Sequence, residues 1–144
     1  PPLPHMHGMS VEDRATEIAD EFEFLDDWEA RYAHLIDLGK ANDALTAQEK
    51  TEETRVRGCA SQVWMVIDEA PEDHLIIRAE SDAMIVSGLI ALLIRLFSGA
   101  DRSAIAAFDA PAFLEKIGVT GALTAQRSNG LASMLARINA AATA

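Results

Sequence analysis

The sequence contains little cysteine, since Cys59 is the only one among 144 residues. One thiol cannot form a disulfide within the chain, and it is a poor basis for a zinc or iron-sulfur site, so we expect no bound metal. A chain without disulfides is typical of reducing compartments. We therefore predict a cytoplasmic protein.

Long hydrophobic runs and basic runs are also absent. The most apolar stretch, residues 83–94, holds about 12 residues, whereas a membrane-spanning helix needs roughly 20, so we predict no membrane contact. Lysine and arginine number 12 against 23 aspartate and glutamate, which gives a net charge of -11 and leaves no cluster that would neutralise phosphates. We therefore expect no nucleic-acid partner, and we expect attraction to basic protein surfaces instead.

The length and composition indicate one globular domain. A hydrophobic fraction of 49% and a charged fraction of 24% are ordinary for such domains, and no Gly- or Pro-rich linker divides the chain. Residues 1–9 contain three prolines and two histidines without a hydrophobic period, so we interpret them as a tag or a disordered terminus. The predicted domain covers residues 10–144.

Apolar residues at helical spacing predict helices in both halves of the chain. Ser10 begins the first helix with a capping-box pattern, and Asp26 or Asp27 can cap the second. Ser81 and Asp82 are placed to cap a long helix that is apolar nearly all round, which we expect at the centre of the core. The predicted helices span about 11–25, 28–39, 83–98, 103–108 and 111–117, with a last amphipathic helix through 131–138.

Two mid-chain segments have the alternation that is typical of strands. Residues 55–68 and 75–80 are rich in Val, Ile and Trp, and residues 69–73 between them carry turn-forming side chains. We therefore expect an antiparallel hairpin. Helices that flank one small antiparallel sheet make a single α+β domain the predicted fold.

Cys59 is the main candidate for chemistry. It follows Gly58 and lies between the strand-like stretches 53–57 and 61–68, so we expect it at the tip of a loop. Arg55 and Arg57 are close in sequence and would favour the thiolate, which is the nucleophilic form. Position alone leaves a second interpretation open, because a lone cysteine is more often a small buried hydrophobic residue.

Two other thiol chemistries are weaker interpretations. A papain-like pair would need His34 or His74, but neither has an identifiable orienting partner, and we do not favour hydrolysis. A thiol peroxidase would form sulfenic acid on Cys59 and turn over peroxide.

Four segments, in order along the chain, resemble the signatures of the SufE family of sulfur acceptors. Asp27 to Lys40 resembles the opening signature of the family, and Arg55 to Trp64, RVRGCASQVW, resembles its active-cysteine motif. Ser81 to Ile90 resembles the start of its central helix, and Leu123 to Leu131 resembles its final signature. They occur in order between about residues 25 and 138, so the resemblance spans most of the predicted domain.

This resemblance implies an α+β fold of the SufE and IscU type and a function in sulfur transfer. Cys59 would take persulfide sulfur from a cysteine desulfurase of the SufS type, stimulate that enzyme and pass the sulfur to a downstream iron-sulfur scaffold complex. No cofactor is implied for the chain itself, because the pyridoxal phosphate belongs to the desulfurase. These motifs do not separate SufE from a CsdE-like paralogue. The alternative is a non-catalytic adaptor or scaffold that binds and modulates a desulfurase while Cys59 only packs.

The resemblance also implies supporting residues around Cys59. Asp82 would lie near the cysteine loop, and Arg127 would steer the partner or stabilise a thiolate. Gly58, Gln62 and Trp64 belong to the cysteine motif. Structural roles compete with each assignment: Asp82 as a helix cap, Arg127 as a solvated side chain, and Gln62 and Trp64 as packing residues of a strand.

Overall fold

Side-chain caps begin the first two helices. In the computed structural model, which describes residues 9–144, helix α2 spans Val11–Glu23, and its N-cap Ser10 accepts a hydrogen bond from the Asp13 N–H at 3.0 Å. Helix α3 spans Trp28–Gly39 and begins after Asp27, whose carboxylate accepts from the Ala30 N–H at 2.8 Å. Both helices lie where the capping patterns predict them. The predicted tag or disordered terminus at 1–9 lies outside the described residues except for Met9.

The sheet is a two-stranded antiparallel hairpin, as predicted. Strand β1 spans Val63–Ala70 and strand β2 spans His74–Ser81. The register pairs the first residue of each strand with the last residue of the other. A short 3-10 turn, Pro71–Asp73, connects the strands.

Residues 57–62 form a loop, as the position of Gly58 predicts, but the strand expected over residues 53–57 is wrong. Arg55 makes only an isolated antiparallel bridge to Trp64. On either side of it, the Val56 N–H donates to Val63 O and the Met65 N–H donates to Thr54 O, both at 2.8 Å. The chain therefore pairs briefly with the start of β1, leaves it, and returns as β1 itself.

Helix α4, Met84–Phe97, supplies much of the core, as its sequence predicts. It packs against β2 and against α3. The helices α3 and α4 approach so closely that a Cβ on Gly88 would lie 2.2 Å from Leu35 O. This approach is possible because glycine has no side chain. The predicted cap is wrong for Asp82: the N-cap is Ala83, which makes no side-chain cap hydrogen bond.

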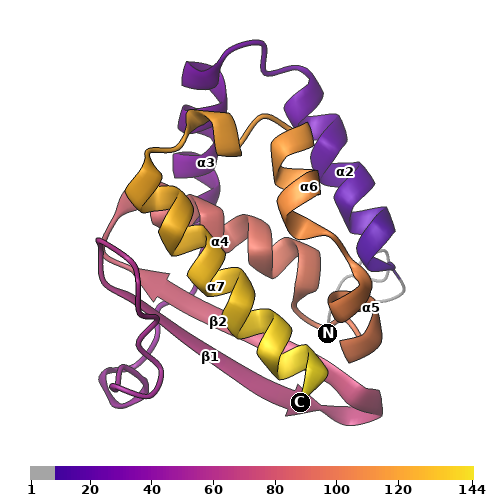
Figure 1. Cartoon of the computed structure of the whole chain (residues 1–144), viewed down its shortest axis with the longest axis vertical. Helices are drawn as coiled ribbons and strands as arrows, with labels where there is room; N and C mark the ends of the chain where they lie inside the picture. Colours follow the sequence, from indigo (N-terminus) through magenta and orange to yellow (C-terminus); the bar gives the residue numbers. More distant parts are fainter. Residues whose placement is uncertain (1–8) are drawn as a thin grey trace.

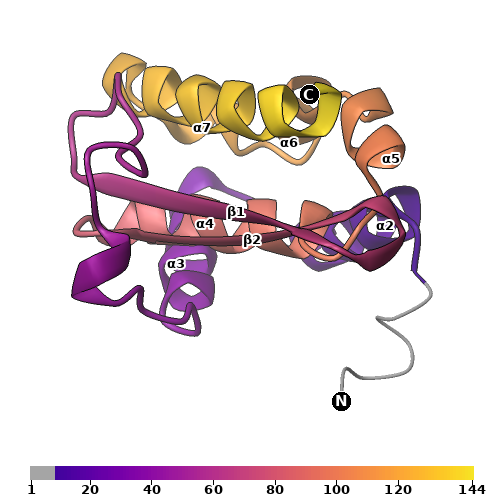
Figure 2. The ribbon, with the colours of Figure 1, turned by 90° about the horizontal axis from the view of Figure 1, so that it is seen from below.

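The C-terminal part is helical and lies over the hairpin. Figure 2 shows α7 on one side of the hairpin and α3 on the opposite side. Helix α7 begins after Thr124 and is longer than the predicted last helix. The remaining elements in this region are α5, Arg102–Ala107; α6, Ala110–Lys116; the 3-10 turn Thr120–Ala122; and α7, Ala125–Thr143.

The described residues form a single α+β domain with six α-helices and one two-stranded sheet, in agreement with the predicted fold class (Figure 1). One further 3-10 turn, Ala47–Glu49, lies in the long connection between α3 and β1. No helix in the described part of the chain has the length and the apolar character needed to cross a membrane.

Candidate functional site

Cys59 lies in the segment 57–62, called here the cysteine loop, as predicted from Gly58. Gly58 has a φ of +88°, a left-handed conformation that other residues rarely adopt. A Cβ at this position would also lie 2.7 Å from the hydroxyl oxygen of Ser133 on α7. Both the backbone conformation and the close approach to α7 therefore require glycine.

Helix α7 also receives the side chain of Cys59. The Cys59 thiol lies 3.8 Å from the carbonyl oxygen of Gly130, to which it is placed to donate a weak hydrogen bond. A Cβ on Gly130 would lie 3.2 Å from the Cys59 sulfur. The missing side chain at Gly130 is what lets the cysteine rest on the helix backbone.

A pocket of about 230 Å³ lies beside the cysteine, between the cysteine loop, the start of α4 and α7. Its floor is apolar, and its rim includes the exposed part of the loop and the first turn of α7. Cys59 itself is half-buried. The lining residues besides Cys59 are Ala60, Ser61, Ala83, Val86, Leu89, Gln126, Arg127, Gly130, Leu131 and Met134.

Burial raises the pKa of the Cys59 thiol above its ordinary value, although the positive charge of Arg55 lowers it in part. Arg55 therefore acts on the thiol in the predicted direction, but burial outweighs its effect. Arg57 pairs with Glu52 at 2.9 Å on the exposed surface. At neutral pH the docked cysteine is a protonated thiol and a weak nucleophile.

Asp82 closes the base of the cysteine loop. Its carboxylate accepts a hydrogen bond from the Gln62 N–H at 3.0 Å, and its own N–H donates to Gln62 O at 3.3 Å. This double contact replaces the predicted helix cap and brings Asp82 next to the loop. The residue Gln62 is itself exposed and does not line the cysteine pocket.

Trp64 does not line the cysteine pocket. Two cations lie near its ring, with Lys50 Nζ at 5.2 Å and the Arg55 guanidinium at 5.7 Å from the ring centroid. These contacts fit the packing role that the sequence left open for Trp64.

Arg127 lies in the first turn of α7 and lines the same pocket as Cys59. Its guanidinium donates to the hydroxyl of Tyr32 on α3 at 3.2 Å and lies 5.9 Å from the centroid of that ring. Arg127 is therefore held at the rim of the pocket and is not simply solvated. Tyr32, which has no chemistry-bearing signal in the sequence, sets its position.

The two histidines that a papain-like pair would need lie elsewhere. His34 contacts Glu21 at 3.1 Å, and His74 begins β2, where it forms a bridge with Asp101. Neither residue lines the cysteine pocket. Among the residues described, no three His, Cys, Asp or Glu side chains are grouped as a metal ion would require.

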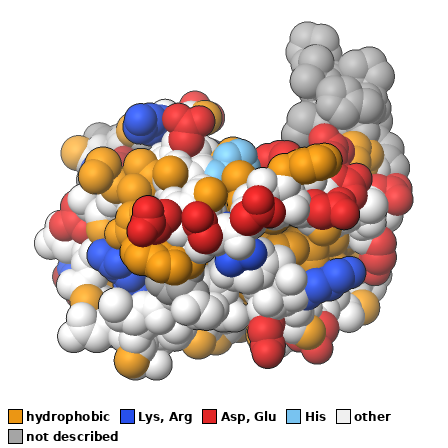
Figure 3. All heavy atoms as spheres, turned by 90° about the horizontal axis from the view of Figure 1, so that it is seen from above, with side chains coloured by type: hydrophobic (Ala, Val, Ile, Leu, Met, Phe, Trp, Pro, Cys, Tyr) orange, Lys and Arg blue, Asp and Glu red, His pale blue; other side chains and the backbone are white. Residues whose placement is uncertain are grey.

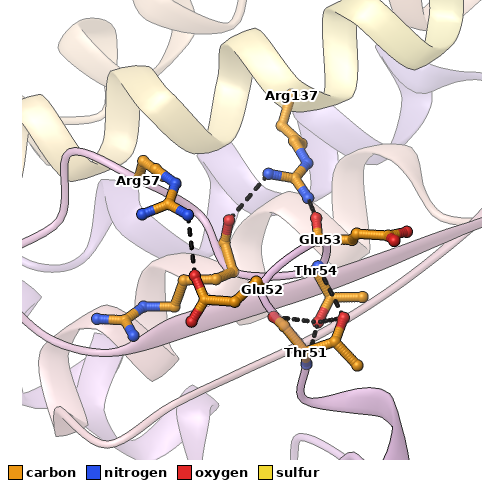
Figure 4. Close-up of polar contacts among 7 residues, drawn as sticks. Thr51, Glu52, Glu53, Thr54, Arg57 and Arg137 are labelled. Carbon is orange, nitrogen blue, oxygen red and sulfur yellow. Dashed lines mark hydrogen bonds and ion pairs between the residues drawn. The ribbon is translucent and has the colours of Figure 1, made fainter.

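Sequence reasoning missed Arg137, which contacts the segment that leads into the cysteine loop. From α7, its guanidinium donates to Arg55 O at 3.0 Å and also to Glu53 O (Figure 4). The signal that would have found it is spacing, because Gly130, Ser133 and Arg137 recur every three to four residues and so share one helix face.

Comparisons with known proteins match most of the chain to one family. The family model described as "SufE: Fe-S metabolism associated domain" matches residues 16–142. An uncharacterized SufE-like protein of Rhizobium etli is 48% identical over 125 residues, which are 85% of this chain and 84% of the relative. Another, of Rhizobium meliloti, is 44% identical over 129 residues, with 88% and 92% covered.

A solved structure shares the fold. It is the solution structure of a hypothetical protein from Thermus thermophilus, with a TM-score of 0.73 and 19% identity. The match covers 90% of this chain and 93% of the other. At this identity the likeness concerns the fold alone.

Proposed function

The chain belongs to the SufE family, whose domain is associated with iron-sulfur metabolism, and on this basis we propose that it is a sulfur carrier. Cys59 takes persulfide sulfur from a cysteine desulfurase of the SufS type, and the chain stimulates that enzyme. It then passes the sulfur to a downstream scaffold complex for iron-sulfur cluster assembly. The observation that supports this proposal best is the placement of Cys59 in a glycine-containing loop beside a small pocket.

The proposed reaction is an exchange between sulfur atoms. The Cys59 thiol loses its proton, and the thiolate attacks the outer sulfur of the persulfide on the desulfurase cysteine. The new sulfur–sulfur bond forms on Cys59, the old one breaks, and the desulfurase cysteine leaves as a thiolate. No net oxidation or reduction occurs, so no further reactant is needed.

The docked position of Cys59 suits storage better than attack. Its contact with Gly130 and its burial keep the thiol protonated, whereas attack requires an accessible thiolate. When the cysteine loop leaves α7, the burial that raises the pKa is lost and the charge of Arg55 remains. After transfer, the return of the loop shelters the persulfide from reductants and from oxidation.

The proposal also concerns the cofactor, the cellular location and the contacts with the desulfurase. The chain carries no cofactor of its own, since the pyridoxal phosphate belongs to the desulfurase, and it works in the cytoplasm. Arg127 at the rim of the pocket and Asp82 at the base of the cysteine loop are the side chains we expect the desulfurase to meet near Cys59.

Mass spectrometry of the intact protein tests the proposal. After incubation with a purified SufS-type desulfurase and cysteine, the chain should gain one or more sulfur atoms, and the Cys59→Ser variant should gain none. Serine is not ionised near neutral pH and forms no persulfide, so the variant is a direct control. A wild-type chain that stays unmodified while it stimulates the desulfurase would identify the adaptor function. Peroxide turnover with sulfenic acid on Cys59 would identify a peroxidase.

A further inference from the structure

One helix, α7, contacts the cysteine loop at two places. At the tip of the loop, Gly58 approaches Ser133 and the Cys59 thiol approaches Gly130 O at 3.8 Å. Just before the loop, Arg137 donates to the carbonyl oxygens of residues 53 and 55. The position of the loop therefore depends on both ends of this helix face.

We propose that Arg137 is a positioning residue that holds the cysteine loop against α7 and so keeps Cys59 docked on Gly130. The inference rests on the proposed sulfur-carrier function, in which docking separates storage of the sulfur from its transfer. It concerns a residue that lies outside the cysteine motif and does not line the cysteine pocket.

The carbonyl oxygens of residues 53–55 have partners on two different elements. The carbonyl of Thr54 points to β1, where it accepts from the Met65 N–H. The carbonyls of Glu53 and Arg55, on either side of it, accept from Arg137 on α7 instead. Figure 4 shows Arg137 reaching them from the helix. This short segment is therefore held by β1 on one side and by Arg137 on the other.

The chemistry of the side chain suits this role. A guanidinium is planar, always charged and able to donate to two acceptors at once. Hydrogen bonds from an ionised donor are also stronger than the contact of a thiol with a carbonyl oxygen at 3.8 Å. The hydrogen bonds of Arg137 are thus stronger than the contact between Cys59 and Gly130. Their loss should shift the equilibrium toward the conformation in which the cysteine loop has left α7.

The rate at which iodoacetamide alkylates Cys59, measured against pH, tests the proposal without any desulfurase. In Arg137→Ala, we expect alkylation at neutral pH to rise about threefold to tenfold, because two carbonyl oxygens lose their charged donor and water replaces part of what those hydrogen bonds contribute. The apparent pKa of the thiol should fall toward its ordinary value. Loss of a positive charge alone would raise the pKa of the thiol. The sign of the pKa change therefore distinguishes undocking from a purely electrostatic effect.

Three further variants serve as controls. Arg137→Lys keeps one charged donor and should restore part of the slow alkylation, and Arg137→Gln replaces the Ala variant if that variant does not fold. Arg102→Ala removes another arginine that donates to α7, to Ala141 O at 2.6 Å, but far along the helix from Gly130. It should lower the melting temperature and leave the pH profile of Cys59 unchanged.

Two results would overturn the proposal. One is a wild-type alkylation rate and pH profile in the folded Arg137 variants. The other is equal acceleration in Arg102→Ala, which would show general loosening of α7. Failure of sulfur loading by a desulfurase, with the alkylation results as expected, would count against the carrier function alone.

Discussion

At the scale of single residues, the docked thiol makes a prediction about pH. Burial raises the pKa of Cys59, so the native protein should react with iodoacetamide with an apparent pKa above that of the same protein unfolded in urea. Folding then favours the protonated thiol. The contribution of the protonated Cys59 thiol to the free energy of unfolding is complete below the pKa of the unfolded thiol. It is lost as the pH rises through the higher pKa of the native protein. An equal or lower apparent pKa in the native protein would show that the cysteine is not docked in solution.

Gly130 offers a second test at this scale. In Gly130→Ala the new Cβ would lie 3.2 Å from the Cys59 sulfur, so the docked cysteine must shift by a few tenths of an ångström and its contact with α7 is weakened. We expect faster alkylation, while the melting temperature changes little because alanine favours the helix by about 1 kcal/mol over glycine. Gly121→Ala is the matched control, since its Cβ would meet no described atom within 4 Å. Alkylation at the wild-type rate in Gly130→Ala would argue against close docking.

At the scale of elements, the sequence correctly predicts those helix boundaries that depend on neighbouring residues. Ser10 and Asp27 cap α2 and α3 as expected, and the apolar spacing locates α4. The strand predicted over residues 53–57 is wrong because residues 52–54 form a turn and only Arg55 bridges to Trp64. The contacts of Gly58 and Cys59 with α7 join residues more than 70 positions apart. The spacing of residues 130, 133 and 137 places them on one face of α7, but it does not report which segment that face contacts.

Asp82 shows how one side chain can serve either of two elements. Its carboxylate accepts from the Gln62 N–H and leaves α4 without a side-chain cap. In Asp82→Ala, we expect faster hydrogen exchange at the Gln62 amide and a loss of about 1 kcal/mol or less of stability, because the contact is exposed. Asp82→Asn keeps an acceptor and should retain most of the protection. Hydrogen exchange at the Gln62 amide can be measured by NMR. Unchanged protection of this amide in the alanine variant would contradict the prediction.

At the scale of the whole molecule, the proposed function requires the cysteine loop to move while the core stays in place. Core residues from α4 and the hairpin form a rigid frame, whereas the cysteine loop rests on α7 through a few contacts. Local opening needs only those contacts to break, and the core stays packed. The family resemblance in the sequence was enough to make Cys59 the candidate residue for sulfur transfer. That the cysteine rests docked and protonated became apparent only with the structure.

The charge of the whole molecule bears on how it meets its proposed partner. The net charge is -11, and Figure 3, which looks onto the end where α2 connects to α3, shows acidic side chains among hydrophobic ones. Phe24 and Trp28, 82% and 55% exposed, lie in that connection and at the start of α3. Charges steer association with a basic surface and are screened beyond about 10 Å at 0.1 M salt and about 3 Å at 1 M.

We therefore expect binding of the desulfurase to weaken as salt rises from low to high concentration, mainly through slower association. Surface plasmon resonance across a salt series measures both rate constants. Cys59→Ser is the control, because it keeps every charge and should show the same salt dependence without sulfur transfer. Rising salt strengthens apolar association or leaves it unchanged, since salt screens only the charged contribution. An affinity that holds constant across the series would therefore assign the interface to apolar contacts such as Trp28 and leave the acidic surface without a role in binding.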